Sequence, residues 1–194
     1  MKFLQKNNDS KILSDTLKYS NVADRGAIRA ELLKEQKGFC AYTEEYFKNS
    51  ETKEIEHFYP KAENPDKEDD YFNWYLVKDH ANKNRPRKIR DYLPIIQPSN
   101  SNLKNRLKYL KGTFRFEEDK NDMEIYNFIQ FLNLNRYELV KDREKHLKRV
   151  LNLRKMAKTE DEFFETLKSD NYYLSYITIL EKELDIELDK YISA

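Results

Sequence analysis

Along the first eighty positions, the spacing of hydrophobic residues changes from helical to short and strand-like. Apolar residues at helical spacing between positions 22 and 36, followed by Gly38, predict a helix that ends at this glycine. Short runs at residues 39–44 and 54–58, separated by a polar turn, predict two strands. A polar loop then leads to a further apolar segment at residues 71–77.

The later part of the chain returns to a helical pattern. Residues 78–85 can begin a helix, which Pro86 would disturb or end. Residues 107–118 alternate around Gly112 and predict a hairpin. From about residue 121 onward, apolar residues lie at helical spacing.

Capping signals divide this second half into several helices. Apolar residues repeat at i, i+3, i+4 and i+7 from Ile125, which predicts a first helix. A long charged helix follows, with Asn135 as its expected N-cap. Thr159 with Glu162 three positions later has the pattern of a capping box and predicts another helix start. Residues 172–192 are expected to finish the chain as helix.

Composition narrows the fold class to α+β. Three glycines and five prolines are too few for an all-β protein with many tight turns. Fourteen Tyr and eleven Phe can fill a core in a chain with 37% charged residues, because each ring buries a large area. We therefore expect an N-terminal helical extension at 1–37, a β-rich core at 38–90, and a connection, hairpin and helical region at 91–194.

Charge and cysteine usage limit the class of protein. The net charge is only +1, and acidic and basic residues alternate rather than forming tails. The single cysteine, Cys40, excludes an internal disulfide framework and a four-cysteine zinc site. No segment has the apolar length of a signal peptide or of a membrane span. We expect a cytoplasmic protein that does not act at a membrane.

The stretch EIEHFYPK, residues 54–61, carries the candidate chemistry. Glu56 offers a carboxylate oxygen and Asn82 an amide oxygen, which are ligands for a hard cation. His57 could activate water as a base, and Asn73 could hydrogen-bond the imidazole and fix its tautomer. Adjacent strand residues face opposite ways, so Glu56 and His57 can share a site only where the strand ends or twists. Pro60 places that end close by.

Simpler interpretations remain open for each of these residues. His57 could be a structural histidine, Glu56 a surface carboxylate, Asn73 a turn residue and Asn82 a helix N-cap. His80 could take the ligand role in place of Asn82. Cys40 fits a small core residue better than a nucleophile.

This combination resembles an HNH nuclease, the ββα-metal fold. Members pair an acidic residue with a histidine at the end of the second strand, followed by a middle asparagine and an Asn or His that opens the helix. The resemblance implies that Glu56 and Asn82 hold Mg²⁺ or Mn²⁺, that His57 is the general base, and that Asn73 orients it. It covers residues 38–88.

A wider resemblance extends over roughly residues 28–155. The segments GFCAYTEE, IEHFYPK, YFNWYLV, YLPIIQPS and FLNLNRYELVKDREKHL are similar to the HNH nuclease subunits of Septu-type and retron-linked anti-phage systems. This resemblance implies an ATPase partner of the ABC or SMC-like type. It also implies a nucleic-acid substrate, with DNA favoured over RNA.

The chain departs from that group at its zinc positions. Many members bind a structural zinc with two CxxC pairs, but here Thr43, Lys78 and Ala81 replace three of the cysteines and only Cys40 is left. One cysteine cannot hold a zinc knuckle, so no structural zinc is expected. Aromatic packing is expected to replace it, from the following residues: Phe39, Tyr42, Phe47, Phe72 and Trp74.

A short basic stretch follows the motif and is a candidate for phosphate contact: Lys83, Arg85, Arg87, Lys88 and Arg90. It could equally be solvated surface. The function expected from the sequence is therefore a metal-dependent HNH endonuclease. Two rivals stay open: a catalytically inactive HNH-like module that binds nucleic acid or a partner, and a helical interaction subunit in which the middle segment is a structural insert.

Overall fold

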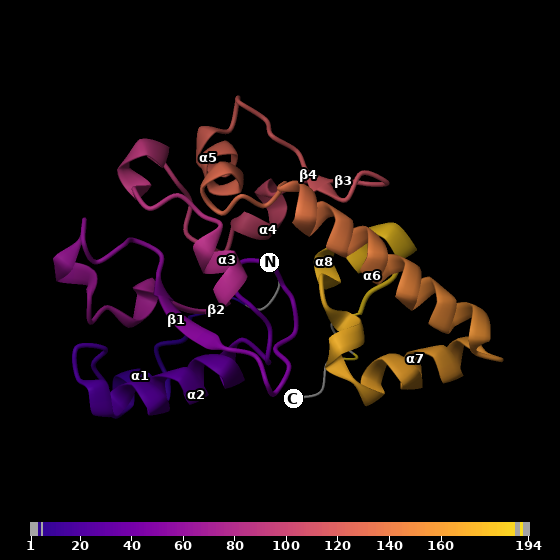
Figure 1. Cartoon of the computed structure of the whole chain (residues 1–194), viewed down its shortest axis with the longest axis horizontal. Coiled ribbons are helices and arrows are strands. Elements are labelled where there is room, and N and C mark those ends of the chain that lie inside the picture. Colours follow the sequence, from indigo (N-terminus) through magenta and orange to yellow (C-terminus); the bar gives the residue numbers. More distant parts are fainter. Residues whose placement is uncertain (1–3, 5, 189–190, 192–194) are drawn as a thin grey trace.

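The computed structural model describes residue 4, residues 6–188 and residue 191. Helices and short strands are mixed, as the α+β expectation requires. Figure 1 shows a small sheet with α1 (Lys11–Ser14) and α2 (Arg25–Glu35) along one side, while the orange and yellow helices gather at the other end of the molecule. No helix in these described parts is long and apolar enough to cross a lipid bilayer.

A two-stranded antiparallel sheet followed by a short helix forms the centre of the N-terminal half. Strand β1 (Lys53–His57) pairs with β2 (Trp74–Lys78), so that His57 lies opposite Trp74. Helix α3 (Asp79–Lys83) begins directly after β2 and ends before Pro86. The predicted strand at 54–58 and the predicted helix start after residue 77 are confirmed. Strand β2 forms from the apolar segment at 71–77, for which the sequence predicts no defined element, and it completes the order β-β-α.

The helix α2 is anchored to the sheet through its C-terminal end. Gln36 donates from Nε2 to the Leu76 carbonyl and accepts from the Leu76 N–H, both at 2.8 Å. Its amide thus satisfies the β2 backbone as a neighbouring strand would. Gly38 follows with φ near +79°, the left-handed conformation that favours glycine at a helix end.

The predicted strand at residues 39–44 is wrong. The segment forms a tight loop with one isolated bridge between Phe39 and Tyr46. Glu44 takes a left-handed backbone conformation with φ near +60°, and the Cys40 N–H bonds the Glu45 carbonyl at 2.8 Å. The chain therefore reverses within six residues, and its apolar side chains enter the core from a turn.

Short elements connect the sheet to the helical half. The predicted hairpin is confirmed as β3 and β4, paired antiparallel around the loop that contains Gly112, with φ near +79°. The short elements are η1 (Val22–Asp24), η2 (Pro65–Lys67), η3 (Tyr71–Asn73), η4 (Ile89–Tyr92), α4 (Leu103–Arg106), β3 (Tyr109–Leu110) and β4 (Arg115–Phe116).

The helical half contains α5 (Met123–Phe131), α6 (Tyr137–Met156), α7 (Glu160–Ser169), η5 (Asn171–Leu174) and α8 (Ile177–Leu184). Thr159 caps α7 by accepting from the Glu162 N–H, as predicted. The single helix expected over 172–192 is instead η5 and α8, separated by Tyr176 in a left-handed conformation. Residues 189–190 and 192 lie outside the described residues.

The expected N-cap role of Asn135 is also wrong, because Arg136 is the N-cap of α6. Asn135 instead accepts from the Phe116 N–H and donates to the Phe116 carbonyl, both at 2.8 Å. Its amide also donates to Glu118. The residue therefore ties the hairpin to the start of α6.

Two hydrophobic clusters organise the described residues. The larger one packs the sheet, α2 and α5 together around fully buried Phe58, Trp74 and Phe131. The smaller one lies among α6, α7 and α8 around Val150 and Phe163. The β-β-α unit thus stands on the first cluster, and the C-terminal helices share the second with Phe39 and Tyr46 of the loop after α2.

Candidate functional site

Helix α3 lies against the face of β1 that carries Glu54 and Glu56. These two carboxylates share a face because strand side chains alternate. Asn82, on α3, donates from Nδ2 to Glu54 Oε2 at 2.8 Å. The amide oxygen of Asn82 is thereby turned away from Glu54 and is left to accept a hydrogen bond.

The guanidinium of Arg85 contacts both expected metal ligands, Glu56 and Asn82. Its Nη2 binds Glu56 Oε1 in an ion pair, and its Nε donates to Asn82 Oδ1 at 3.3 Å. Nη2 also lies 3.3 Å from the His57 carbonyl. The Arg85 side chain is 3% exposed and its Cζ is 5.0 Å from the centre of the Phe131 ring. One buried positive charge therefore stands between Glu56 and Asn82.

Two polar atoms at this place have no hydrogen-bond partner among the described residues. They are Nη1 of Arg85 and the hydroxyl of Tyr42, both buried. Burial lowers the pKa of Arg85 and raises that of Tyr42, and the charge of each group partly offsets the effect on the other. Buried polar groups normally have partners, so these atoms mark a place where a further group could bind.

His57 is held by a separate set of contacts. The residue is 5% exposed, and its Nε2 donates to the Glu68 carbonyl at 2.9 Å. Trp74 Nε1 donates to the same carbonyl at 2.9 Å, and the Tyr19 ring lies edge-on to the imidazole at 4.5 Å. Because a carbonyl only accepts, the neutral imidazole carries its proton on Nε2 and its lone pair on Nδ1.

The electrostatics of His57 favour this neutral form. Burial lowers its pKa below the ordinary value, although the hydrogen bond to the Glu68 carbonyl acts in the opposite direction. A neutral imidazole near pH 7 is the protonation state that a general base needs.

Asn73 does not contact the imidazole. Its fully buried amide accepts from the Tyr59 N–H at 2.8 Å, and donates to the carbonyls of Tyr59 at 2.9 Å and Lys67 at 3.2 Å. These bonds close the loop that carries Glu68. The expected direct bond from Asn73 to His57 is therefore replaced by an indirect arrangement, in which Asn73 holds the loop and the Glu68 carbonyl orients the ring.

The structure brings Glu56 and Asn82 together through Arg85, but it does not bring the His57 side chain into contact with them. We expected all three to face one space. Strand alternation at positions 56 and 57 explains the separation, since Glu56 turns toward α3 and the imidazole toward the Glu68 loop.

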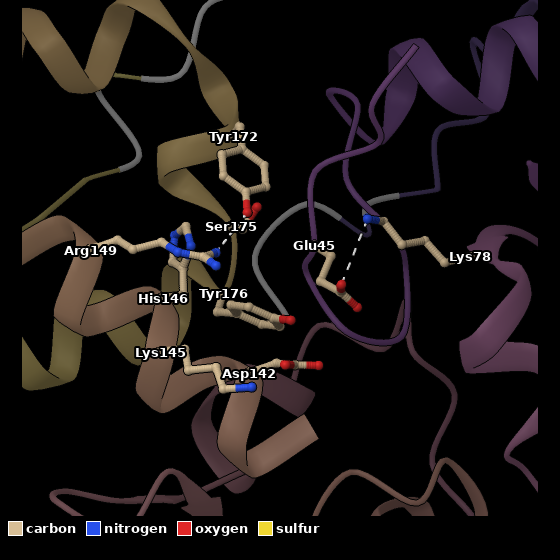
Figure 2. A pocket seen from close by; sticks show the side chains of 9 residues that line it. All are labelled: Glu45, Lys78, Asp142, Lys145, His146, Arg149, Tyr172, Ser175 and Tyr176. Carbon is tan, nitrogen blue, oxygen red and sulfur yellow. Dashed lines mark hydrogen bonds and ion pairs between the residues drawn. The ribbon is translucent and has the colours of Figure 1, made fainter. Parts of the chain in front are cut away.

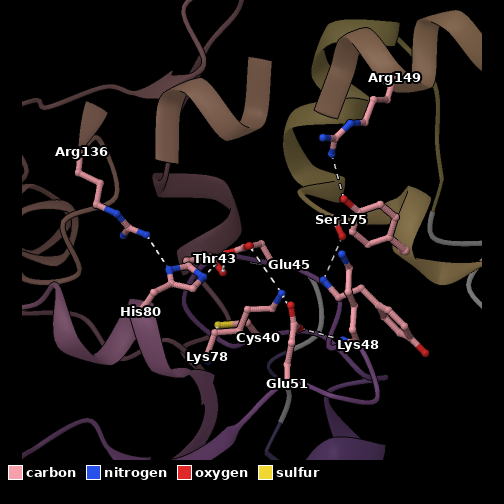
Figure 3. A network of polar contacts seen from close by, with 12 residues as sticks. Cys40, Thr43, Glu45, Lys48, Glu51, Lys78, His80, Arg136, Arg149 and Ser175 are labelled. Carbon is pink, nitrogen blue, oxygen red and sulfur yellow. Dashed lines mark hydrogen bonds and ion pairs between the residues drawn. The ribbon is translucent and has the colours of Figure 1, made fainter. Parts of the chain in front are cut away.

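His80, the alternative ligand, belongs to a different network (Figure 3). Its Nε2 lies 3.0 Å from Glu45 Oε2, and its Nδ1 accepts from Arg136 Nη2 at 2.9 Å. Both ring nitrogens are thus used in linking the loop after α2 to the start of α6. Among the described residues, no contact joins His80 to Glu56.

The same network contains the positions at which the resembled nucleases bind zinc (Figure 3). Lys78 Nζ lies 2.9 Å from Glu51 and 3.7 Å from Glu45, while the Lys78 N–H points to Cys40 Sγ at 3.4 Å. Thr43 donates to Glu45 at 2.8 Å. Lys78 therefore pairs with two carboxylates through its ammonium group and contacts Cys40 through its backbone N–H.

The charges of this network are strongly coupled. Burial alone would raise the pKa of Glu45, but its hydrogen bonds with His80 and Thr43 and the nearby positive charges lower it to about 2. Burial raises the pKa of Cys40, which leaves a neutral thiol. The arrangement fits a structural ion-pair cluster and a cysteine of low nucleophilicity.

The aromatic packing expected in place of zinc is found only in part. Phe72 is 38% exposed and does not belong to it, whereas Ala81, at another of the zinc positions, is buried. The buried members are Phe39, Tyr42, Phe47 and Trp74. Buried aromatic side chains and the Lys78 ion pairs together fill the region around the expected zinc positions.

A cavity of about 130 Å³ lies between this network and α6 (Figure 2). Lys145 and Arg149 of α6 enter from one side and Glu45 from the other. Arg149 bonds the Tyr172 hydroxyl at 3.0 Å. Asp142 and Glu45 bring negative charge to the same space, so the cavity does not favour one sign of ligand.

The predicted basic stretch is divided by burial. Arg85 is buried, and Lys83 pairs with Asp79 on α3 at 2.8 Å. The other three, Arg87, Lys88 and Arg90, are exposed. Within this stretch, only Arg87, Lys88 and Arg90 are therefore open to a polyanion, and Arg90 also lies 3.9 Å from the Asp91 carboxylate.

Three features of the site are not predicted by the sequence. Arg85 was grouped with its neighbours by charge, and the signal that could have separated it is its position directly before Pro86, at the end of α3. The Glu68 carbonyl is a backbone group and has no side-chain signature. Tyr19 lies far from the motif in the sequence, and its contact with His57 could not be predicted.

No protein-family model, no curated protein and no solved structure matches this chain. Within the residues that the structure describes, no three His, Cys, Asp or Glu side chains form a metal-binding group. The donor set is one carboxylate oxygen from Glu56 and one amide oxygen from Asn82, both directed at the Arg85 guanidinium. Its chemistry fits a hard cation that takes its remaining ligands from water or substrate.

Proposed function

We propose that this protein is a metal-dependent HNH-type endonuclease that hydrolyses phosphodiester bonds of nucleic acid. The observation that carries the proposal is the convergence of Glu56 and Asn82, from the β-β-α unit, on one positive charge. Those are the two positions at which the resemblance to HNH nucleases expects metal ligands. The β1–β2–α3 order supports the same proposal.

In this proposal, Glu56 and Asn82 would hold Mg²⁺ or Mn²⁺. Such a cation supplies, when bound, a positive charge that stabilises the leaving oxygen of the phosphodiester. Glu56 provides the anionic ligand and Asn82 a neutral one. Asn82 is kept in orientation by its bond to Glu54.

His57 would accept the proton of the attacking water at Nδ1. The Glu68 carbonyl fixes the tautomer, and Trp74 fixes the carbonyl. Asn73 holds the loop that carries Glu68. For His57 and the ligands to act on one phosphate, the substrate must bridge the two sets of contacts, with the phosphate near Glu56 and the water near His57.

Cleavage of plasmid DNA and of RNA with Mn²⁺, Mg²⁺ or chelator tests the proposal. His57→Ala should lower cleavage by about 10²–10⁴-fold, the usual contribution of a general base. His146→Ala is the matched control, because His146 is also buried, donates to a carbonyl (Tyr173, 3.0 Å) and packs edge-on against tyrosines. Equal loss in both variants, or no metal-dependent cleavage of either nucleic acid, would contradict it.

The alternative function is a catalytically inactive HNH-like module that binds nucleic acid or a partner. One observation favours it: the Arg85 ion pair already neutralises Glu56. An inactive module would bind a labelled oligonucleotide or partner with the same affinity in chelator and in Mn²⁺, and Glu56→Gln would not change that affinity.

The resemblance to anti-phage nucleases further suggests an ATPase partner of the ABC or SMC-like type. We propose that residues from about 120 to 194 dock onto this partner, and the large apolar side chains of Tyr137 and Met156, exposed at the two ends of α6, support a docking role. Because the chain has a net charge of only +1, the free protein should hold nucleic acid weakly. Co-purification with such an ATPase, followed by cleavage assays alone and in complex, tests this part.

A further inference from the structure

We propose that Arg85 is an internal cation that occupies the metal site at rest and moves to a substrate phosphate when the metal binds. The inference rests on the proposed function and adds a regulatory and substrate-binding residue to the same site. It starts from the contacts of one guanidinium: Nη2 with Glu56, and Nε with Asn82.

A metal ion and the guanidinium compete for the same oxygens. Glu56 Oε1 and Asn82 Oδ1 each accept from Arg85, and a cation that takes these oxygens as ligands must displace those N–H groups. Arginine stays protonated at any physiological pH, so the competition cannot be relieved by loss of a proton. The free chain should therefore bind a divalent cation more weakly than its ligands alone would.

The surroundings of Arg85 allow it to change partners. It lies on the irregular segment between α3 and η4, where the backbone is not committed to a helix or strand. Its Nη1 is buried and has no partner within the described residues, so the guanidinium has donor capacity to spare. Tyr42 adds an unpartnered buried hydroxyl beside it.

Three exposed cations next to Arg85 in the sequence can bring a phosphate close enough to compete with Glu56 for the guanidinium. Arg87, Lys88 and Arg90 are exposed directly after it and would draw a phosphate backbone to this segment. Arginine binds phosphate through paired N–H groups, as it binds carboxylate. A phosphate that takes over the guanidinium frees Glu56 and Asn82, so nucleic acid and metal should bind cooperatively.

Reciprocal coupling of the two ligands makes the inference measurable without turnover. The protein carries His57→Ala to prevent cleavage, and Mn²⁺ binding is followed by calorimetry with and without a short DNA duplex. Arg85→Gln should bind Mn²⁺ about 10- to 100-fold more tightly than the Arg85 protein in the absence of DNA, since a charge-assisted interaction no longer competes. The duplex should tighten Mn²⁺ binding in the Arg85 protein and should not do so in Arg85→Gln.

Two further variants secure the interpretation. Glu56→Gln should weaken Mn²⁺ binding with either residue at position 85, which shows that the titrated site is the intended one. Arg85→Lys keeps the positive charge but loses the planar fork, and should give a smaller gain of about 3- to 10-fold. If circular dichroism shows that Arg85→Gln is unfolded, the comparison is made with Arg85→Lys instead.

The outcomes separate this inference from the proposed function. Unchanged Mn²⁺ affinity in the folded Arg85 variants overturns the inference, while metal-dependent cleavage by the unmodified chain would leave the function standing. Tighter Mn²⁺ binding in Arg85→Gln, with no cleavage by any protein that retains His57, supports the internal cation and contradicts the nuclease. Absence of Mn²⁺ binding in every variant, with and without DNA, overturns both.

Discussion

Replacement of Asn73 by alanine should destabilise the protein and impair the His57 site through the loop that Asn73 closes. The amide is fully buried and makes three hydrogen bonds, two with the backbone of Tyr59 and one with the Lys67 carbonyl. Each such bond contributes about 0.5–1.5 kcal/mol net, so Asn73→Ala should lower the free energy of unfolding by about 2–4 kcal/mol. For a chain of this size, that is a fall in Tm of about 4–16 °C.

Asn135→Ala is the matched control for this experiment. Asn135 is also buried and makes three bonds of the same kind, accepting from the Phe116 N–H and donating to the Phe116 carbonyl and Glu118. Asn135→Ala should lose a similar amount of stability, but Asn135 ties the hairpin to the start of α6 and has no contact with the His57 loop among these bonds. Only Asn73→Ala should move the Glu68 carbonyl that orients His57.

Urea unfolding, followed by circular dichroism and by the fluorescence of the single tryptophan, measures both effects. Trp74 donates to the Glu68 carbonyl, so its emission in the folded state should shift in Asn73→Ala and not in Asn135→Ala. Cleavage, measured well below both Tm values, should fall by about 10²-fold in Asn73→Ala alone, because small misplacements of reacting groups are costly. A loss of stability under about 0.5 kcal/mol in Asn73→Ala, or an equal loss of cleavage in Asn135→Ala, would refute the reasoning.

Three further predictions concern pH, the Glu45 network and zinc. Burial lowers the pKa of His57 and of His146, so as the pH falls the unfolded chain takes up protons near pH 6.5 before the folded chain does. The stability that these histidines contribute is therefore fully present above pH 6.5 and falls as the pH drops below it. Tm measurements between pH 5 and 7.5 test this, and a Tm that rises on acidification would contradict it. Glu45→Gln removes charged hydrogen bonds from a largely buried carboxylate and should cost about 1.5–3 kcal/mol in urea unfolding. Glu165→Gln, which breaks an exposed pair with Lys168, should cost less than about 1 kcal/mol. Elemental analysis should find no stoichiometric zinc, and a chelator should leave the Tm unchanged; one tightly held zinc per chain would show that Cys40 and its neighbours bind metal after all.

The parts of the fold that could be predicted are those in which local pattern and tertiary structure agree. Strand β1 is a short segment bounded by polar turn residues, and Pro86 limits α3 as expected. The apolar pattern of residues 71–77 does not by itself separate a strand from a helix, and pairing with β1 makes its second half strand β2. The loop at residues 39–44 has the same apolar content as a strand. It fails as one because Gly38 and Glu44 adopt left-handed backbone conformations, which an apolar pattern does not report.

The candidate site shows a similar limit. The pairing of Glu56 with Asn82 followed from resemblance to a motif, since residues on a strand and a later helix have no local signal that joins them. The partner of His57 is a backbone carbonyl, and every residue in the chain has one. The sequence predicts that Asn73 bonds the His57 imidazole and that Asn135 caps the long helix. Both amides instead hold a distant segment of backbone, because a buried amide can satisfy a donor and an acceptor at once.

Arg85 also bears on the choice between a nuclease and an inactive module. Its ion pair with Glu56 places a positive charge between the two expected metal ligands. Nη1 of Arg85 has no partner among the described residues, but neither have Nη1 of Arg136 and Nε of Arg143, so an unpartnered N–H does not separate the two functions. The separation comes from competition at Glu56. In a nuclease, Mn²⁺ must displace the guanidinium from this carboxylate, whereas in an inactive module the Arg85–Glu56 pair persists in Mn²⁺ and in chelator alike.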